Sequence, residues 1–160
     1  KLRACGHQNF VVDAGGDIFA SGINQEASYP YWAFDIENPH QPDQSVATVL
    51  LSNEAIATSG RNRRTWTKNG SVKHHLIDPA TLDSASMNLM TVSVITPNTT
   101  SADIWAKTFF ILGVDQGLPL AEQMGIPTLF ITHDHKMITS STWQQKIWQP
   151  TSQPTSNQVH

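Results

Sequence analysis

Along the first hundred residues, short apolar stretches alternate with small and polar residues that favour turns. Apolar side chains that recur at every second position, or in runs of four to eight, are typical of β-strands. The Gly15-Gly16 and Asn69-Gly70 pairs separate such stretches and predict tight hairpins. On this basis we predict strands over residues 9–13, 18–20, 31–36, 46–51, 55–58, 64–68, 72–77 and 90–96.

After Pro97 the apolar positions recur at helical spacing. Ser101 is a suitable N-cap for the first helix, and Gly113 is a suitable C-terminal stop. The expected elements are a helix from Ser101 to about Leu112, a second helix from about Pro119 to Gly125, and a final hairpin with strands over 127–131 and 137–142. The pattern therefore predicts one domain of the α+β class, a mostly antiparallel sheet with about two packed helices.

Size and composition fit one ordinary globular domain, because 39% of the 160 residues are hydrophobic and 14% are charged. The net charge of −3 argues against a nucleic-acid partner, which needs clustered basic residues to replace phosphate counterions. Cys5 is the only cysteine, so the chain can form neither an internal disulfide nor a thiolate zinc site. No run approaches the ~18 apolar residues of a membrane span. Residues 149–160, rich in Thr, Ser, Gln and Pro, predict a disordered tail after a domain at 1–148.

The stretch from His74 to Thr81 brings imidazole, carboxylate and hydroxyl groups together before and after Pro79. Alternation along a strand that ends near Pro79 would place His75 and Ile77 on one face and His74 on the other. The histidines could be a surface pair beside a turn or part of a site. Asp78 could likewise hold the turn or contact a ligand, as could Thr81.

Four separated segments, together with a Trp-containing stretch at 32–39, resemble one family, the ApbE-like FAD:protein FMN transferases. Several motifs in the right order are far more specific than any one of them. The segments are 9–17, 57–60, 74–79 and 102–113. The resemblance spans roughly residues 8–145, matches only the C-terminal half of the family's domain, and implies an ApbE-like (T-fold-like) architecture.

The resemblance also implies a reaction and its participants. In that family FAD is split at its pyrophosphate, and FMN is attached to a Thr or Ser hydroxyl of a partner flavoprotein, with Mg²⁺ required. FAD is thus the implied substrate, and the implied partners are an acceptor flavoprotein and an N-terminal half of the same domain. Because the chain opens on Lys1, we expect a processed or truncated piece. Its compartment stays open between the bacterial cytoplasm and the outer face of the cytoplasmic membrane.

Several residues inherit candidate roles from the resemblance. His75 matches the family's active-site histidine, and the intrinsic pKa of histidine lets an imidazole accept a hydroxyl proton near neutral pH. A satisfied core histidine is the alternative. The segment Ala57-Thr58-Ser59-Gly60 combines small side chains with backbone N–H groups at a strand end, which suits close approach of a phosphate or of the flavin ring. A plain turn is the alternative, and the resemblance favours the ligand-facing role.

Asp103 matches the family's metal-binding carboxylate, although a negative charge early in a helix is favourable without any metal. The family usually has a second ligand, Thr, four residues later, where this chain has Lys107. Thr108 is rotated ~100° around the helix and is no substitute. Lys107 either neutralises the pyrophosphate in place of Mg²⁺ or marks a flavin-binding or interaction domain that no longer transfers FMN. The His133-Asp134-His135 cluster is interpreted as a polar turn.

Overall fold

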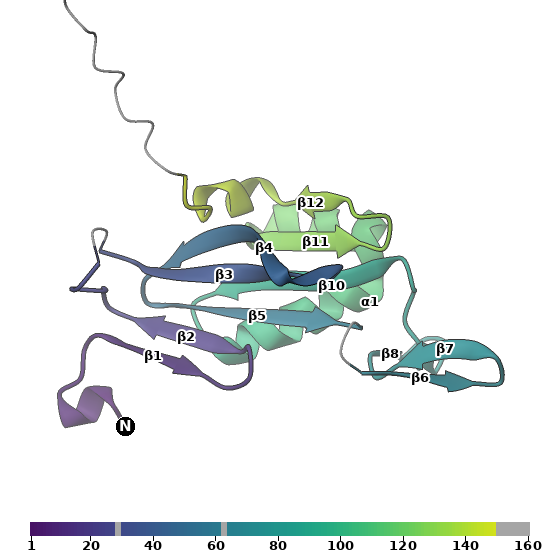
Figure 1. Cartoon of the computed structure of the whole chain (residues 1–160), viewed down its shortest axis with the longest axis horizontal. Coiled ribbons are helices and arrows are strands. Elements are labelled where there is room, and N and C mark those ends of the chain that lie inside the picture. The colour runs from purple at the N-terminus through teal and green to yellow at the C-terminus, as the bar shows by residue number, and fades with distance from the viewer. Residues whose placement is uncertain (28–29, 62–63, 150–160) are drawn as a thin grey trace, which may run out of the picture.

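The computed structural model describes residues 1–27, 30–61 and 64–149. Its centre is a six-stranded sheet in which every neighbouring pair is antiparallel, in the order β1-β2-β5-β10-β11-β12 (Figure 1). These strands are β1 Phe10–Asp13, β2 Ile18–Ser21, β5 Glu54–Gly60, β10 Leu89–Thr96, β11 Thr128–Thr132 and β12 Met137–Thr139. Three separate two-stranded pairings are β3 Trp32–Asn38 with β4 Gln41–Leu51, β6 Thr65–Lys68 with β7 Ser71–His74, and β8 Ile77–Asp78 with β9 Asp83–Ser84. The helical elements are η1 Arg3–Cys5, α1 Thr99–Met124 and η2 Ser141–Gln145.

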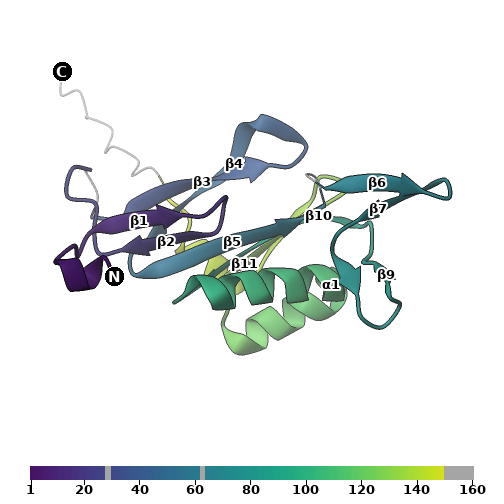
Figure 2. The ribbon, with the colours of Figure 1, turned by 90° about the horizontal axis from the view of Figure 1, so that it is seen from below.

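The sheet has a hydrophobic layer on each face, with α1 on one side and the β3–β4 hairpin on the other (Figure 2). Side chains alternate between the two faces along β5, which explains why both faces are apolar. Ala55 and Ala57 pack with Ala102 of α1, while Ile56 between them belongs to the cluster that contains Leu51 of β4. The mostly antiparallel α+β fold predicted from the sequence is therefore confirmed.

The helical region is one element, α1, which Gly113 divides at the position predicted as the stop of the first helix. The element begins two residues earlier than predicted because Asn98 is the N-cap and its side chain accepts a hydrogen bond from Ser101 N–H. Gly113 alone leaves the helical conformation, at φ 73° and ψ 179°. The chain bends there, so that Gly117 lies against the Phe109 carbonyl. Gly125 ends the element in the left-handed conformation, as predicted.

Several strand boundaries were predicted wrongly. The strand expected over 72–77 ends at His74, and His75 lies in a bend before β8, so the predicted shared face of His75 and Ile77 does not exist. β4 begins at Gln41 rather than residue 46 because its exposed, polar first half pairs with β3. β5 continues through the expected Ser59-Gly60 break because β10 pairs with it up to Gly60.

The last predicted strand, 137–142, ends at Thr139 and is followed by η2. Residues 150–160, most of the predicted tail, lie outside the described residues. Among the described residues, no helix combines the length and the apolar character needed to cross a bilayer.

Candidate functional site

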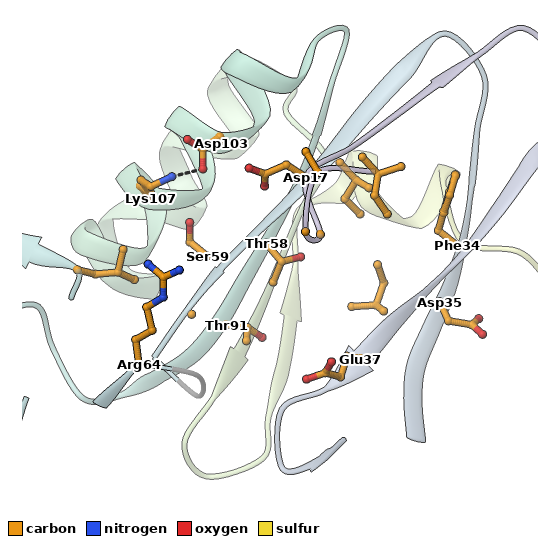
Figure 3. Close-up of a pocket in the computed structure, with 18 of the residues that line it drawn as sticks. Asp17, Phe34, Asp35, Glu37, Thr58, Ser59, Arg64, Thr91, Asp103 and Lys107 are labelled. Carbon is orange, nitrogen blue, oxygen red and sulfur yellow. Dashed lines mark hydrogen bonds and ion pairs between the residues drawn. The ribbon is translucent and has the colours of Figure 1, made fainter. Parts of the chain in front are cut away.

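A cavity of about 550 Å³ opens at the end of the main sheet where β5 ends and the β1–β2 hairpin turns (Figure 3). Its volume lies in the range of small-molecule sites. The walls come from the β1–β2 turn, β3, β5, β10, α1 and both ends of the β6–β7 hairpin. The lining residues are Ala14, Gly15, Gly16, Asp17, Ile18, Phe34, Asp35, Ile36, Glu37, Ile56, Thr58, Ser59, Gly60, Arg64, His75, Leu76, Thr91, Asp103 and Lys107.

One wall of the cavity is a strand edge that has no pairing strand on the cavity side. β2 pairs with β5 only as far as the Ile18↔Ile56 position, whereas β10 pairs with β5 up to Gly60. In the described part of the chain, residues 57–60 therefore have a strand on one side alone. Backbone groups at such an edge can bind a ligand. The chain turns away from β5 here because Gly15 and Gly16 adopt positive φ values in the β1–β2 turn.

The helix side of the cavity carries a compact group of charges. Lys107 forms an ion pair with Asp103 one turn earlier on α1, and the Asp17 carboxylate points toward them from the β1–β2 turn (Figure 3). Partial burial and the nearby Asp103 raise the pKa of Asp17 above its usual value, and Lys107 opposes that shift. Asp103 lies beyond the first turn of α1, which contains no acidic residue. Lys107, rather than the helix dipole, therefore stabilises the Asp103 carboxylate.

The two adjacent histidines have different environments. His75 is exposed and lines the cavity. His74 is completely buried, where Leu76 N–H donates to its Nδ1 at 3.3 Å and its Nε2 lies 3.1 Å from the Ala85 carbonyl oxygen. Burial lowers the pKa of His74, and the hydrogen bond to Ala85 opposes part of this effect. The core histidine of this motif is therefore His74.

The structure brings together six of the nine candidate residues and leaves three outside the cavity. Thr58, Ser59, Gly60, His75, Asp103 and Lys107 all line it. Ala57 is buried between β5 and α1. Asp78 accepts a hydrogen bond from Ala80 N–H, and the Thr81 hydroxyl accepts one from Asp83 N–H at 3.4 Å, so both side chains hold the turn after β8.

Three further cavity residues were not among the predicted site residues. Asp17 follows a Gly-Gly turn that needs no ligand to explain it. Arg64 belongs to a basic run after Ser59-Gly60 that could reach a phosphate but is more simply explained as a solvated surface, and it lines the cavity. Phe34, on β3, provides an apolar wall opposite the charged side (Figure 3). The sequence predicted a strand over 31–36, but only the tertiary structure places Phe34 at the cavity.

The described residues do not assemble a metal centre. Over 1–27, 30–61 and 64–149, no group of three or more His, Cys, Asp or Glu side chains is placed to hold a metal ion. The predicted polar turn at His133-Asp134-His135 joins β11 to β12, with Asp134 paired to Lys136 and the His135 ring stacked on His40 at 3.7 Å between centroids. Lys136 and the Thr132 hydroxyl lower the pKa of Asp134 to about 2.

Comparison with known proteins identifies the family that this fold and cavity represent. The model of the ApbE family matches residues 1–130, and the chain belongs to that family. It is 32% identical over 148 residues to the FAD:protein FMN transferase of Treponema pallidum, covering 88% of this chain and 41% of the relative. The transferase of Haemophilus influenzae is also 32% identical, over 145 residues, with 89% and 41% covered.

Solved structures agree with this assignment. The flavin transferase ApbE from Vibrio cholerae superimposes with a TM-score of 0.73 at 28% identity, covering 91% of this chain and 46% of that one. The ApbE protein of Thermotoga maritima shares the fold with a TM-score of 0.78 at 23% identity, covering 88% and 45%. The chain thus spans about two fifths of the length of the curated relatives that it matches.

Proposed function

We propose that this chain is the C-terminal part of an FAD:protein FMN transferase. The observation that carries the proposal is the convergence of the β5 edge, His75 and Lys107 on one cavity, although they lie far apart in the sequence. Lys107 and Arg64 supply positive charge beside Ser59, as a pyrophosphate requires (Figure 3). Phe34 and its apolar neighbours on the opposite wall suit a flavin ring.

The proposed reaction is a displacement at phosphorus. The oxygen of an acceptor Thr or Ser hydroxyl bonds to the phosphorus on the FMN side of FAD, the bridging P–O bond breaks, and AMP leaves. The hydroxyl proton passes to a base, and we assign this role to His75 because it is the histidine that lines the cavity. Lys107 and Arg64 offset the negative charge on the phosphates during the displacement.

Magnesium, which the family implies, does not fit the residues present here. Asp103 is the matching carboxylate, but Lys107 is paired with it, and the Thr108 hydroxyl donates to the Ile104 carbonyl of its own helix at 2.8 Å. A Mg²⁺ ion prefers six oxygen ligands. The Asp103 carboxylate is already neutralised by the Lys107 ammonium group. We therefore derive no step that passes through a metal ion.

The same ion pair favours a second candidate function, a flavin-binding or interaction domain without transfer activity. A lysine contributes one positive charge where Mg²⁺ would contribute two, so the pyrophosphate would be less well neutralised in the transition state. A magnesium titration separates the candidates, because activity that needs no divalent cation supports transfer, and bound flavin without transfer supports binding alone.

The test uses the natural full-length protein, FAD and a candidate acceptor flavoprotein. We expect flavin fluorescence to remain on the acceptor after denaturing electrophoresis. His75→Ala should reduce the labelling rate at least about 100-fold, the usual contribution of a general base, while FAD binding and the circular dichroism spectrum persist. His133→Ala, which removes another exposed histidine, is the matched control and should label at the normal rate. Full activity of His75→Ala would exclude the assigned base. Absence of both label and bound flavin in the unmodified protein would contradict transfer and flavin binding and would favour an interaction domain.

A further inference from the structure

The positive charge of the chain is concentrated in one acid-free segment. Between Glu54 and Asp78 there is no carboxylate, yet this stretch holds half of the chain's 10 Lys and Arg residues. They are Arg61, Arg63, Arg64, Lys68 and Lys73. The rest of the chain has five basic residues against all 13 Asp and Glu. This uneven distribution gives the segment a charge opposite to that of the chain as a whole.

Most of the segment forms a projecting hairpin, which we call the β6–β7 arm and define as residues 64–75. Its two strands pair only with each other, and the ribbon extends away from the end of the main sheet (Figures 1 and 2). Every residue of β6 is exposed, including Trp66 at 47%, and Val72 on β7 is exposed to 50%. The arm therefore presents large apolar side chains to the solvent, and only its end at His74 packs into the core.

The register of the arm places aromatic and basic side chains on one face. Trp66 pairs directly with Lys73, and Lys68 lies two residues along the same strand, so all three share a face. Lys73 reaches Asp83 at 2.5 Å. Asp83 therefore balances the charge of Lys73, and Lys68 supplies the positive charge beside Trp66. An exposed tryptophan beside a lysine is a suitable contact for an acidic protein surface, because Trp is enriched among residues that dominate binding energy and the charge steers association.

The arm also adjoins the cavity at both of its ends. Arg64 immediately precedes β6 and His75 immediately follows β7, and both line the cavity. A protein bound along the arm would thus reach the cavity mouth beside the proposed base. This continuity distinguishes the arm from an isolated exposed hairpin.

We propose that the β6–β7 arm docks the acceptor protein, through an acidic patch next to the hydroxyl that receives FMN. The proposal rests on the proposed function, and it adds the surface and the chemistry of the partner. The face of Trp66 and Lys68 binds the acceptor, whereas the cavity binds the flavin nucleotide. Acceptor affinity and FAD affinity should therefore respond to different residues.

The test measures initial rates of acceptor labelling by the full-length protein at varied acceptor concentration, together with FAD binding by fluorescence. Trp66→Ser should raise the KM for the acceptor about tenfold, as expected for a central interface aromatic, and leave the Kd for FAD within about twofold. Lys68→Glu should raise the same KM and weaken its dependence on salt. Trp148→Ser and Lys136→Glu are the matched controls, since both residues are exposed and lie outside the arm.

Three outcomes would overturn the proposal. An unchanged acceptor KM in both arm variants would exclude docking there. If the arm variants raised the Kd for FAD as much as the KM for the acceptor, the arm would belong to the flavin site instead. Arm-dependent binding to phosphatidylglycerol vesicles with an unchanged acceptor KM would assign it to a membrane surface. If the unmodified protein binds FAD but labels no acceptor, direct titration of the acceptor against the arm variants decides the docking proposal separately from the transfer reaction.

Discussion

Neighbouring residues in this chain can have unrelated roles, as His74 and His75 show. One is enclosed by the core beside Phe110, and the other lines the cavity. The hydrogen bonds of His74 require a neutral ring that carries its proton on Nε2, because Nδ1 accepts from Leu76 N–H and Nε2 donates to the Ala85 carbonyl. A second proton would abolish the bond from Leu76.

His74 should therefore make stability depend on pH. Burial holds its pKa in the folded protein below the usual histidine value of about 6.5, so the unfolded chain binds more protons as the pH falls below about 6.5. The free energy of unfolding should fall in that interval, and urea titrations at pH 7.5 and pH 5 measure the loss. His74→Phe should lower stability by about 1–3 kcal/mol at pH 7.5, because two buried backbone groups lose their partner, but should show a smaller decline toward pH 5. An equal decline in both proteins would contradict this role.

Lys107 should determine whether Asp103 can bind a divalent cation. Lys107→Thr removes the competing ammonium and adds an oxygen donor one turn from Asp103. We expect Mn²⁺ to bind this variant about tenfold more tightly than the natural protein, measured by electron paramagnetic resonance of the free ion. The matched change Lys136→Thr, which breaks the exposed pair with Asp134 outside the cavity, should leave Mn²⁺ affinity unchanged. Equal affinity in Lys107→Thr and the natural protein would show that the lysine does not exclude the metal.

At the scale of elements, α1 depends on one residue that interrupts it. Gly113 has dihedral angles that side-chain-bearing residues rarely adopt, although the space around its Cα is open. The bend it allows brings Gly117 against Phe109 and Phe130, which closes the helix layer over the sheet. The element therefore covers a wide apolar surface with a single chain reversal.

Replacement of Gly113 should be costly for conformational reasons alone. Gly113→Ala should lower the free energy of unfolding by about 1–3 kcal/mol, the cost of a residue held in such a region. Gln116→Ala, at an exposed position of the same helix, is the control and should change stability by less than about 0.5 kcal/mol. Chemical denaturation followed by circular dichroism measures both. Equal stabilities would mean that the bend can relax to accept alanine.

At the scale of the whole molecule, two hydrophobic clusters share one sheet. Phe109 of α1 belongs to one cluster and Leu51 of β4 to the other, and both residues are fully buried. Strand β10 contributes Val94 to the first cluster and Ile95 to the second. The layers therefore depend on the same strands and should unfold together.

Core truncations should test this cooperativity. Phe109→Ala should cost about 3–5 kcal/mol and Leu51→Ala about 2–5 kcal/mol. Each variant should still unfold in one transition that fluorescence and circular dichroism report alike. Ile104→Ala, at a 54% exposed position of α1, provides the surface control and should shift the transition little. A separate transition for one variant would show that the two layers are independent units.

Much of the fold could be predicted from local patterns, because alternation, hairpin glycines and helix stops act within a few residues of one another. The strands at 10–13 and 18–21 and the Gly125 helix end illustrate this. The prediction failed where a distant partner decides the outcome. Strand β5 continues past Ser59 because β10, about thirty residues later in the chain, pairs with it.

The amino-acid sequence by itself determined the α+β class, the family resemblance and the residue types available for the proposed phosphate and flavin contacts. Only the tertiary structure decided that Asp17, Phe34 and Arg64 join His75 and Lys107, and that Asp78 and Thr81 do not. The physical reason is that periodicity records which face of an element is buried, whereas a cavity depends on strand order and register between segments far apart in the chain.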